Sequence, residues 1–206
     1  MEVIDLGRRG YKEVWELQLQ VHKDRVAGRA GDTLILVEHD PVVTIGRSGS
    51  IKNLLIPEAE LKKRGIELYR IERGGDITYH GPGQLVGYPI FEIKRGFAGI
   101  RPFIRMIERV IGKVLADFGI EAEPGPHPGL WVEDRKILSI GIAVRSWVSF
   151  HGFALNVNNR AQDFAIINPC GHAGMVMTSM QEVLGRMLDW EAVKSGVISH
   201  FQAELA

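Results

Sequence analysis

Residues 130–157, LWVEDRKILSIGIAVRSWVSFHGFALNV, decide the fold class. Two apolar, β-branched runs, Lys136–Arg145 and Val148–Val157, make up most of this stretch, and the polar tripeptide Glu133–Arg135 separates the first of them from Leu130–Val132. Short runs of this kind, divided by turn-forming residues, are typical of neighbouring strands joined by hairpins. We therefore expect an antiparallel or mixed sheet.

Further elements are expected on both sides of this stretch. Hydrophobic periodicity and end signals predict strands at 3–6, 33–38, 42–45, 66–72 and 84–89, and helices at 11–26, 57–64 and 101–118. A short helix is expected to begin at the capping box Thr178-Ser179-Met180-Gln181, and a last one after the cap Asp189. Because strands outnumber helices, an α+β domain, a mixed or antiparallel sheet packed with helices, is favoured over an alternating fold.

Composition narrows the class of protein. The 206 residues show no repeat or linker, so we expect residues 1–206 to form a single domain. The 25 basic and 25 acidic side chains cancel, which gives no global sign of a nucleic acid or membrane partner. No window approaches the ~18 apolar residues of a membrane span. Cys170 is the only cysteine, which excludes an intrachain disulfide and favours the cytoplasm.

The polar stretch RGGDITYHGPGQ, residues 73–84, follows a predicted strand. It holds four glycines, which allow a backbone to approach a ligand closely, among many hydrogen-bonding side chains. This density predicts a binding or catalytic loop, although a turn-rich connection between strands is the alternative. The spacing does not match a nucleotide-binding P-loop.

Lys136 begins the apolar run KILSIGIAV, residues 136–144. Strand alternation predicts that Lys136, Leu138, Ile140 and Ile142 share one face. A lysine among apolar residues loses solvation, which lowers its pKa and frees the amine to act as a base. Taken by itself, however, the segment favours a lysine that reaches water from the start of a strand.

Cys170 lies between Pro169 and Gly171 in INPCGH, residues 167–172, which indicates a tight turn. An accessible turn cysteine can act as a nucleophile when a neighbouring cation or base helps to form the thiolate. The candidates for that neighbour are Lys136, His80, His151 and His172. A histidine partner would suggest a papain-like hydrolase, and an inert turn cysteine is the other alternative. A metal site is not favoured, because the seven histidines show no close pairing and a single cysteine cannot build a thiolate site.

Four segments together resemble one family, the lipoyl(octanoyl) transferases of lipoate biosynthesis. They are RGGDITYHGPGQ (73–84), GLWV with KILSIG (129–141), FHGFALNV (150–157) and INPCG (167–171), in the family's order and approximate spacing. The resemblance implies the fold of the biotin- and lipoate-protein ligase catalytic domain. It also implies that no metal, nucleotide or organic cofactor is needed.

The resemblance further implies roles for individual residues. Cys170 would be the nucleophile that forms an acyl-thioester, and Lys136 would activate it and later serve as a base. The acyl site would be lined by Arg73, Gly74, Gly75, Asp76, Ile77, Thr78, Tyr79, His80, Ser139, Ile140, Gly141, Gly152, Phe153 and Ala154. The implied donor is octanoyl-acyl carrier protein. The implied acceptors are lipoyl domains of 2-oxo acid dehydrogenase E2 subunits and the glycine cleavage H protein, and we expect a monomer.

Three other functions fit parts of the sequence. An ATP-dependent lipoate or biotin ligase on the same fold would form an acyl-adenylate and would act only with ATP. A cysteine hydrolase using His80 or His172 would release free fatty acid. A binding module would hold a peptide or carrier domain and would lose no activity on mutation of Cys170.

Overall fold

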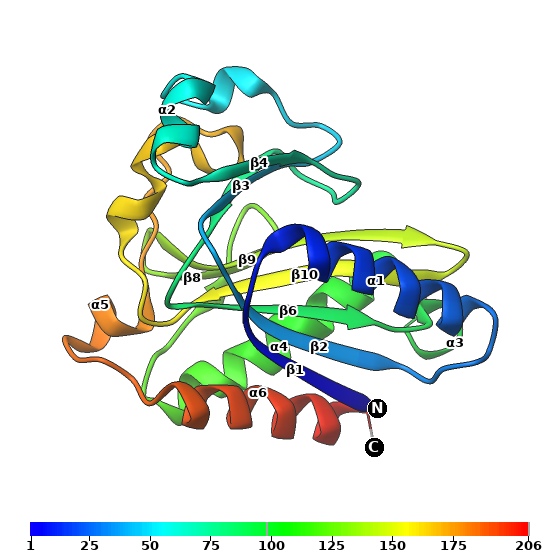
Figure 1. The fold of residues 1–206 in the computed structure, drawn as a ribbon. Coiled ribbons are helices and arrows are strands. Elements are labelled where there is room, and N and C mark those ends of the chain that lie inside the picture. The colour runs from blue at the N-terminus through cyan, green and yellow to red at the C-terminus, as the bar shows by residue number, and fades with distance from the viewer. Residues whose placement is uncertain (98, 206) are drawn as a thin grey trace.

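Two sheets form the framework of the protein in this computed structural model, which describes residues 1–97 and 99–205 (Figure 1). The larger sheet has the order β1-β2-β6-β10-β9-β8-β7, and the smaller has the order β4-β3-β5. The strands are β1 (Glu2–Arg9), β2 (Thr33–His39), β3 (Val42–Ile45), β4 (Glu67–Arg70), β5 (Ile77–His80), β6 (Gln84–Ile90), β7 (Glu123–Pro124), β8 (Gly129–Val132), β9 (Arg135–Arg145) and β10 (Val148–Asn156). The α-helices are α1 (Tyr11–Val26), α2 (Glu58–Lys63), α3 (Ile93–Gly96), α4 (Ile100–Asp117), α5 (Met180–Leu184) and α6 (Trp190–Glu204), and the 3-10 helices are η1 (Ile51–Asn53), η2 (Ala161–Ile166) and η3 (Pro169–Gly171).

Both sheets are mixed, which confirms the expected α+β class. β1 runs parallel to β2 and β3 runs parallel to β4, whereas the other pairs are antiparallel. The hairpins β8–β9 and β9–β10 occur where the sequence predicts them. Other strands that follow one another in the chain are not paired in this way, because β2 and β3, and likewise β5 and β6, belong to different sheets. The chain therefore passes from the larger sheet to the smaller between β2 and β3, and returns between β5 and β6.

The stretch 73–84 was expected to be a continuous loop, but it contains the strand β5. Ile77–His80 pairs antiparallel with β3, placing Ile77 opposite Ile45 and His80 opposite Val42. A strand of four residues between glycine-rich turns leaves little periodicity to detect. As a result, the polar side chains of this stretch are held by a sheet.

Helices cover the two faces of the larger sheet (Figure 1). α1 packs on one face through Val14, against Ile35 and Val86, and α4 and α6 pack together on the other face. α4 buries Ile107, Ile111 and Val114 as its sequence pattern predicts. The same face of α4 also buries Glu108, which the apolar pattern does not reveal.

Two helix starts can be compared with their predicted caps. The Asp189 side chain accepts hydrogen bonds from the amides of Glu191 and Ala192, so the predicted cap of α6 is confirmed. At α5 the capping residue is Ser179 rather than Thr178, because the Ser179 hydroxyl accepts from the Glu182 amide at 3.3 Å. The predicted box is therefore displaced by one residue.

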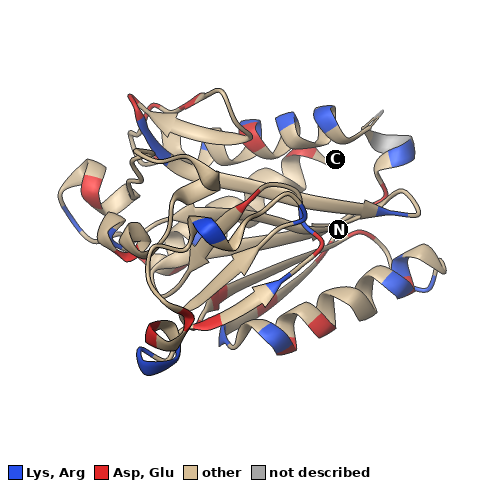
Figure 2. Ribbon diagram, turned by 90° about the horizontal axis from the view of Figure 1, so that it is seen from above, with Lys and Arg blue, Asp and Glu red and all other residues tan. Residues whose placement is uncertain are grey.

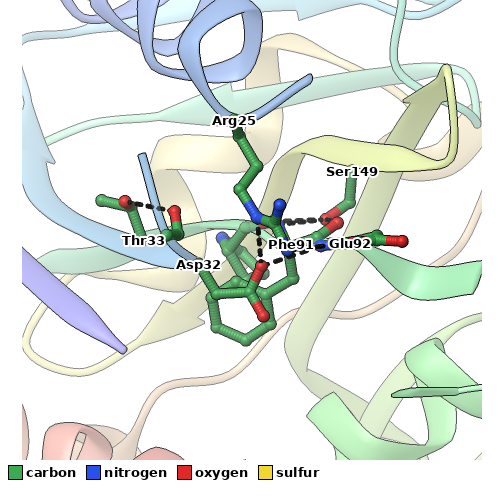
Figure 3. A network of polar contacts seen from close by, with 8 residues as sticks. Arg25, Asp32, Thr33, Phe91, Glu92 and Ser149 are labelled. Carbon is green, nitrogen blue, oxygen red and sulfur yellow. Dashed lines mark hydrogen bonds and ion pairs between the residues drawn. The ribbon is translucent and has the colours of Figure 1, made fainter. Parts of the chain in front are cut away.

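A polar network holds the C-terminal end of α1 against the sheet (Figure 3). Arg25 Nε donates to Asp32 Oδ1 at 2.7 Å, and its Nη2 lies 3.2 Å from Glu92 Oε2. The same Asp32 oxygen accepts from the Glu92 amide at 2.9 Å, and Ser149 Oγ accepts from the Phe91 amide at 3.0 Å. These contacts hold the C-terminal end of α1 over the sheet.

Acidic and basic residues are interspersed along the ribbon of the outer elements in the view of Figure 2, in keeping with equal numbers of acids and bases. None of the helices in the described part of the chain has the length and apolar character that crossing a membrane would require.

Candidate active site

A β-bulge in β9 determines where Lys136 points. Trp131 pairs with Lys136 whereas its neighbour Leu130 pairs with Leu138, so Ile137 is an extra residue on β9. Directly paired residues share a face, and adjacent residues of β8 lie on opposite faces. Lys136 and Leu138 therefore lie on opposite faces, and the predicted shared face is wrong. Leu138 packs in the core below α4, while Lys136 faces the space between the two sheets.

The Lys136 side chain is buried and lies beside Cys170. It is 2% exposed, and its Nζ lies 3.6 Å from Cys170 Sγ. Burial lowers the pKa of Lys136 below its usual value, because an ammonium group loses hydration there. Cys170 and the carboxylate of Glu108 oppose this shift. The sequence left the partner of Cys170 open between lysine and histidine, and the geometry places Lys136 next to it.

Cys170 occupies a strained turn within η3. Its φ of 55° is in the left-handed region, which residues with a side chain rarely adopt. The next residue, Gly171, has a φ of 78°, and a Cβ there would lie 2.5 Å from Asp76 Oδ2. Asp76 accepts hydrogen bonds from the Asn53 side chain at 2.8 Å and from the Ser50 amide at 3.0 Å. The glycine-rich stretch and the cysteine turn are thus in direct contact, and Asp76 fixes the segment on which the turn rests.

Backbone hydrogen bonds connect Lys136 to the segment that follows the cysteine turn. The Lys136 amide donates to the Val176 carbonyl at 2.9 Å, and the Thr178 amide donates to the Lys136 carbonyl at 3.0 Å. The segment therefore continues the pairing at the start of β9. Lys136 is thus paired with a segment that begins six residues after Cys170.

A cavity between the two sheets connects these groups. Every residue predicted for the site lines it except Tyr79. The lining residues are Tyr11, Arg73, Gly74, Gly75, Asp76, Ile77, Thr78, His80, Val86, Tyr88, Lys136, Ser139, Ile140, Gly141, His151, Gly152, Phe153, Ala154 and Cys170. The three segments 73–80, 136–141 and 152–154, far apart in sequence, therefore meet at one cavity.

Tyr79 lies on the other side of β5. Its ring packs edge-on against Phe164, with 5.8 Å between ring centroids, in a separate apolar cluster. Strand alternation explains this position, because β5 directs Thr78 and His80 toward the cavity and the residue between them away from it.

Close backbone packing shapes the cavity walls. A Cβ on Gly152 would lie 2.0 Å from the Gly87 carbonyl oxygen, and a Cβ on Gly87 would lie 2.2 Å from the Phe153 ring. Gly141 is similarly close to the Gly74 carbonyl, at 3.0 Å. Glycine at these positions lets neighbouring strands and the 73–76 segment approach one another.

Arg73 is a buried structural cation at the cavity wall. Its guanidinium donates to Thr44 Oγ1 and, at 2.8 Å, to the Thr44 carbonyl, and it also donates to Gly74 O. Burial lowers the pKa of Arg73. The side chain joins the 73–76 segment to β3.

Sequence reasoning missed three lining residues, namely Tyr11, Val86 and Tyr88, and it named His151 only as a possible partner of Cys170. Tyr88 Oη is bonded to His39 Nε2 at 2.8 Å, and Tyr11 stacks on the His80 ring with 6.2 Å between centroids. For Tyr11 the sequence offers one signal of a site, because this tyrosine stands at the start of the first predicted helix, ahead of its apolar stripe. Val86 and Tyr88 lie in a strand whose apolar character indicates only burial.

The histidines proposed as partners of Cys170 have other contacts. His80 Nδ1 is bonded to Gln84 Oε1 at 2.7 Å, and burial lowers its pKa to about 3. His151 Nε2 lies 3.3 Å from Glu72 Oε2. His172 stacks on His127 with 4.3 Å between centroids. Within the described residues, His, Cys, Asp and Glu form no group of three or more that could hold a metal ion.

Comparison with known proteins agrees with this fold. The model of the family described as Lipoyl protein ligase A/B catalytic domain matches residues 10–202, and the chain therefore belongs to that family. Among solved structures, lipoate-protein ligase A bound with ATP superposes with a TM-score of 0.75 at 19% identity, covering 100% of this chain and 86% of the other. The biotin protein ligase from Aquifex aeolicus in complex with biotin and ATP superposes with a TM-score of 0.61 at 13% identity, and the match covers 99% of this chain and 70% of the ligase. These likenesses confirm the predicted ligase-like fold.

Curated relatives define the activity more closely. An octanoyltransferase from Syntrophotalea carbinolica is 45% identical over 206 residues, covering 100% of this chain and 94% of the relative. An octanoyltransferase from Dictyoglomus thermophilum is 51% identical over 180 residues, which cover 86% of this chain and 76% of the relative. Within its family the chain is thus an acyltransferase, a lipoyl(octanoyl) transferase that transfers octanoyl groups in lipoate biosynthesis.

Proposed function

We propose that the enzyme moves an octanoyl group from octanoyl-acyl carrier protein to a lysine amine of a lipoyl domain, through an acyl-thioester on Cys170. The observation that carries this proposal is the separation of 3.6 Å between Lys136 Nζ and Cys170 Sγ at a cavity between two sheets. A thiol next to a buried amine supports nucleophilic acyl transfer, because an adjacent base can activate the nucleophile. Residues 1–206 act as one catalytic domain in this proposal.

The first half-reaction forms the thioester. The neutral amine of Lys136 accepts the proton of the Cys170 thiol, which gives a thiolate beside an ammonium group. The thiolate attacks the carbonyl carbon of the donor thioester. A new S–C bond forms on Cys170, the bond to the carrier's thiol breaks, and the leaving sulfur takes up the proton from Lys136. One thioester is exchanged for another, so the step is close to isoenergetic.

The second half-reaction forms the amide. The acceptor lysine has an ordinary pKa near ~10.4 and must lose a proton before it attacks. That first proton goes to solvent, and the neutral amine of Lys136 takes a second proton from the attacking nitrogen as the N–C bond forms. The S–C bond to Cys170 breaks, and the proton returns to the cysteine sulfur. The burial that lowers the pKa of Lys136 supports its use as a base in both steps.

The tetrahedral intermediates need hydrogen-bond donors for an oxyanion, where one donor is typically worth ~3 kcal/mol. The amides of Gly171 and Gly74 already donate to the carbonyls of Asn168 and Ile142, each at 2.9 Å. We therefore propose that the donors are other backbone amides of the cysteine turn and of the 75–78 segment, which line the same cavity.

The octanoyl chain occupies the cavity in this proposal. Ile77, Ile140 and Phe153 are apolar lining residues, with Val86 and Ala154 farther along the sheet. Burial of one methylene contributes ~0.8 kcal/mol, so the chain adds substantially to binding. Arg73, Gly75, Thr78 and Ser139 line the same space and would position the thioester end, and Asp76 holds the cysteine turn.

The proposed acceptors are lipoyl domains of 2-oxo acid dehydrogenase E2 subunits and the glycine cleavage H protein, in the cytoplasm. The sequence resemblance supports them. A further support is a solved relative in fold, a bi-partite lipoate protein ligase from Thermoplasma acidophilum, which was studied with its E2 lipoyl domain.

One reconstitution tests the whole proposal. The enzyme, octanoyl-acyl carrier protein and an apo lipoyl domain are mixed without ATP, and each protein is weighed by mass spectrometry. The expected products are an octanoylated lipoyl domain and free carrier protein. A requirement for ATP would indicate a ligase, and released octanoate with an unmodified lipoyl domain would indicate a hydrolase. With donor alone, the native enzyme should gain one octanoyl group, and the Cys170→Ala protein should gain none.

A further inference from the structure

Glu108 is a carboxylate buried in an apolar helix face. It is 5% exposed and lies on α4 between core residues Ile107 and Ile111. A buried carboxylate lowers stability unless hydrogen bonds and opposite charges compensate for the lost hydration. Its Oε2 accepts from Arg105 Nη1 at 2.9 Å, but the Arg105 side chain is 63% exposed. Packing alone does not explain an acid at this position.

The other carboxylate oxygen is bonded to the strand that contacts Lys136. Glu108 Oε1 accepts from the Gly129 amide at 3.0 Å. Gly129 begins β8 with a φ of 136°, and a Cβ on it would lie 3.0 Å from Lys136 Cε and 2.0 Å from the Leu138 carbonyl oxygen. The backbone at Gly129 therefore lies directly against the lysine side chain, and Glu108 fixes that backbone from below.

We propose that Glu108 is a positioning residue for the Cys170–Lys136 pair, which holds β8 against the lysine side chain and places a negative charge near its amine. The inference rests on the proposed roles of Cys170 and Lys136. When Lys136 accepts the thiol proton it becomes a buried cation. A fixed carboxylate nearby stabilises that cation and so favours the thiolate–ammonium pair over the neutral pair.

The charged and titratable groups around Lys136 come from several elements. Cys170 contacts the amine from η3, Glu108 acts on it from α4, and His127 from the segment before β8 interacts with it electrostatically. His172 stacks on His127, and Arg105 is bonded to Glu108. Besides the Cys170 sulfur, the Glu108 carboxylate is the acid that acts on the Lys136 amine, so it helps to balance the ammonium.

Alkylation of Cys170 by iodoacetamide tests this role without any octanoyl donor. Cys170 is the only cysteine, so one mass adduct reports its reactivity over a range of pH. Glu108→Gln keeps an oxygen that can accept from the Gly129 amide but removes the charge. We expect alkylation at neutral pH to slow by about threefold to tenfold, which corresponds to at most about one pKa unit, and the pH profile to move to higher pH. An unchanged profile in folded protein would overturn the proposal.

A double-mutant cycle separates positioning from a general structural effect. If Glu108 acts through Lys136, Glu108→Gln should not slow alkylation in a Lys136→Ala background. Equal slowing in both backgrounds would overturn the proposal. Because no acyl transfer is measured, failure of the proposed octanoyl chemistry would leave this result intact.

A surface variant keeps the test valid if Glu108→Gln fails to fold, which circular dichroism would reveal. Arg105→Gln removes the exposed guanidinium that shares the carboxylate, and leaves the buried residues in place. The Glu108 charge then acts on Lys136 with less compensation, so the alkylation profile should move to lower pH. A profile that stays in place or moves to higher pH would count against the proposal.

Discussion

The ring of Trp131 lies over the amine of Lys136, with 4.6 Å between Nζ and the ring centroid. The two residues are directly paired across β8 and β9, so the sheet register holds them together. An aromatic face attracts a cation but has little affinity for a neutral amine. Trp131 therefore favours the protonated lysine and partly offsets the burial that lowers the pKa of Lys136.

Replacing Trp131 by leucine should slow acylation of Cys170. Loss of a cation–π contact of about 0.5–2 kcal/mol corresponds to a decrease of about 2-fold to 30-fold in the first half-reaction. Single-turnover kinetics with octanoyl-acyl carrier protein would measure it. Trp131→Phe retains an aromatic face and should lose less. Equal losses in the two variants would show that bulk, and not the ring face, matters.

Lys136→Met should abolish activity and stabilise the fold. A buried lysine side chain replaced by an apolar one of similar length removes the cost of burying an amine, about 1–2 kcal/mol at neutral pH. The measurement is urea unfolding, with circular dichroism as the probe. An inactive variant that is less stable at pH 7 would contradict this expectation.

The same variant carries a pH signature. Because the folded-state pKa of Lys136 is lowered, the unfolded state binds more protons between that pKa and about 10.5. The contribution of Lys136 to the free energy of unfolding therefore rises with pH across that window. The stability advantage of Lys136→Met should shrink as the pH is raised toward 10.5, and unfolding curves of both proteins at several pH values would detect the change.

His39 should make the protein sensitive to acid. It is fully buried and bonded to Tyr88, and burial lowers its pKa to about 4 from the usual 6.5. Between these values the unfolded state binds the extra proton, so stability falls as the pH drops from 6.5 to about 4, by at most ~1.4 kcal/mol per pH unit. His39→Gln should reduce this slope in unfolding experiments. An unchanged slope would mean that His39 does not contribute.

Arg25→Ala should lower thermal stability through the network at the end of α1 (Figure 3). Arg25 contacts Asp32 and Glu92 with a side chain that is only 19% exposed. Loss of such charge-assisted bonds costs about 1.5–3 kcal/mol, and the melting temperature should fall by roughly 3–10 °C. The control is Arg29→Ala, which removes a more exposed pair with Asp24 and should cost less than about 0.5 kcal/mol. Similar shifts in the two variants would contradict the expected difference.

The sequence predicts the fold class and the residues around the cavity, because these depend on local patterns and recognisable motifs. The hairpins of β8, β9 and β10 follow from apolar runs and a polar turn, and the α6 cap follows from Asp189. β5 escaped detection, because a short strand between glycines has too few residues to show a period.

Two site features depend on pairing between distant segments and could not be predicted. The bulge at Ile137 reverses the face of Lys136 relative to Leu138, and only the register with β8 reveals it. Glu108 lies inside an apolar helix pattern, and its partner Gly129 becomes visible only when α4 packs beneath β8. Tyr79 is a predicted site residue that proved wrong, because it points away from the cavity that its neighbours in the motif line.

The hydrogen bonds between Lys136 and residues 176 and 178 have a mechanical consequence. The segment that follows the cysteine turn and the start of β9 form one paired unit, so any displacement of residues 176–178 would also displace the backbone of Lys136.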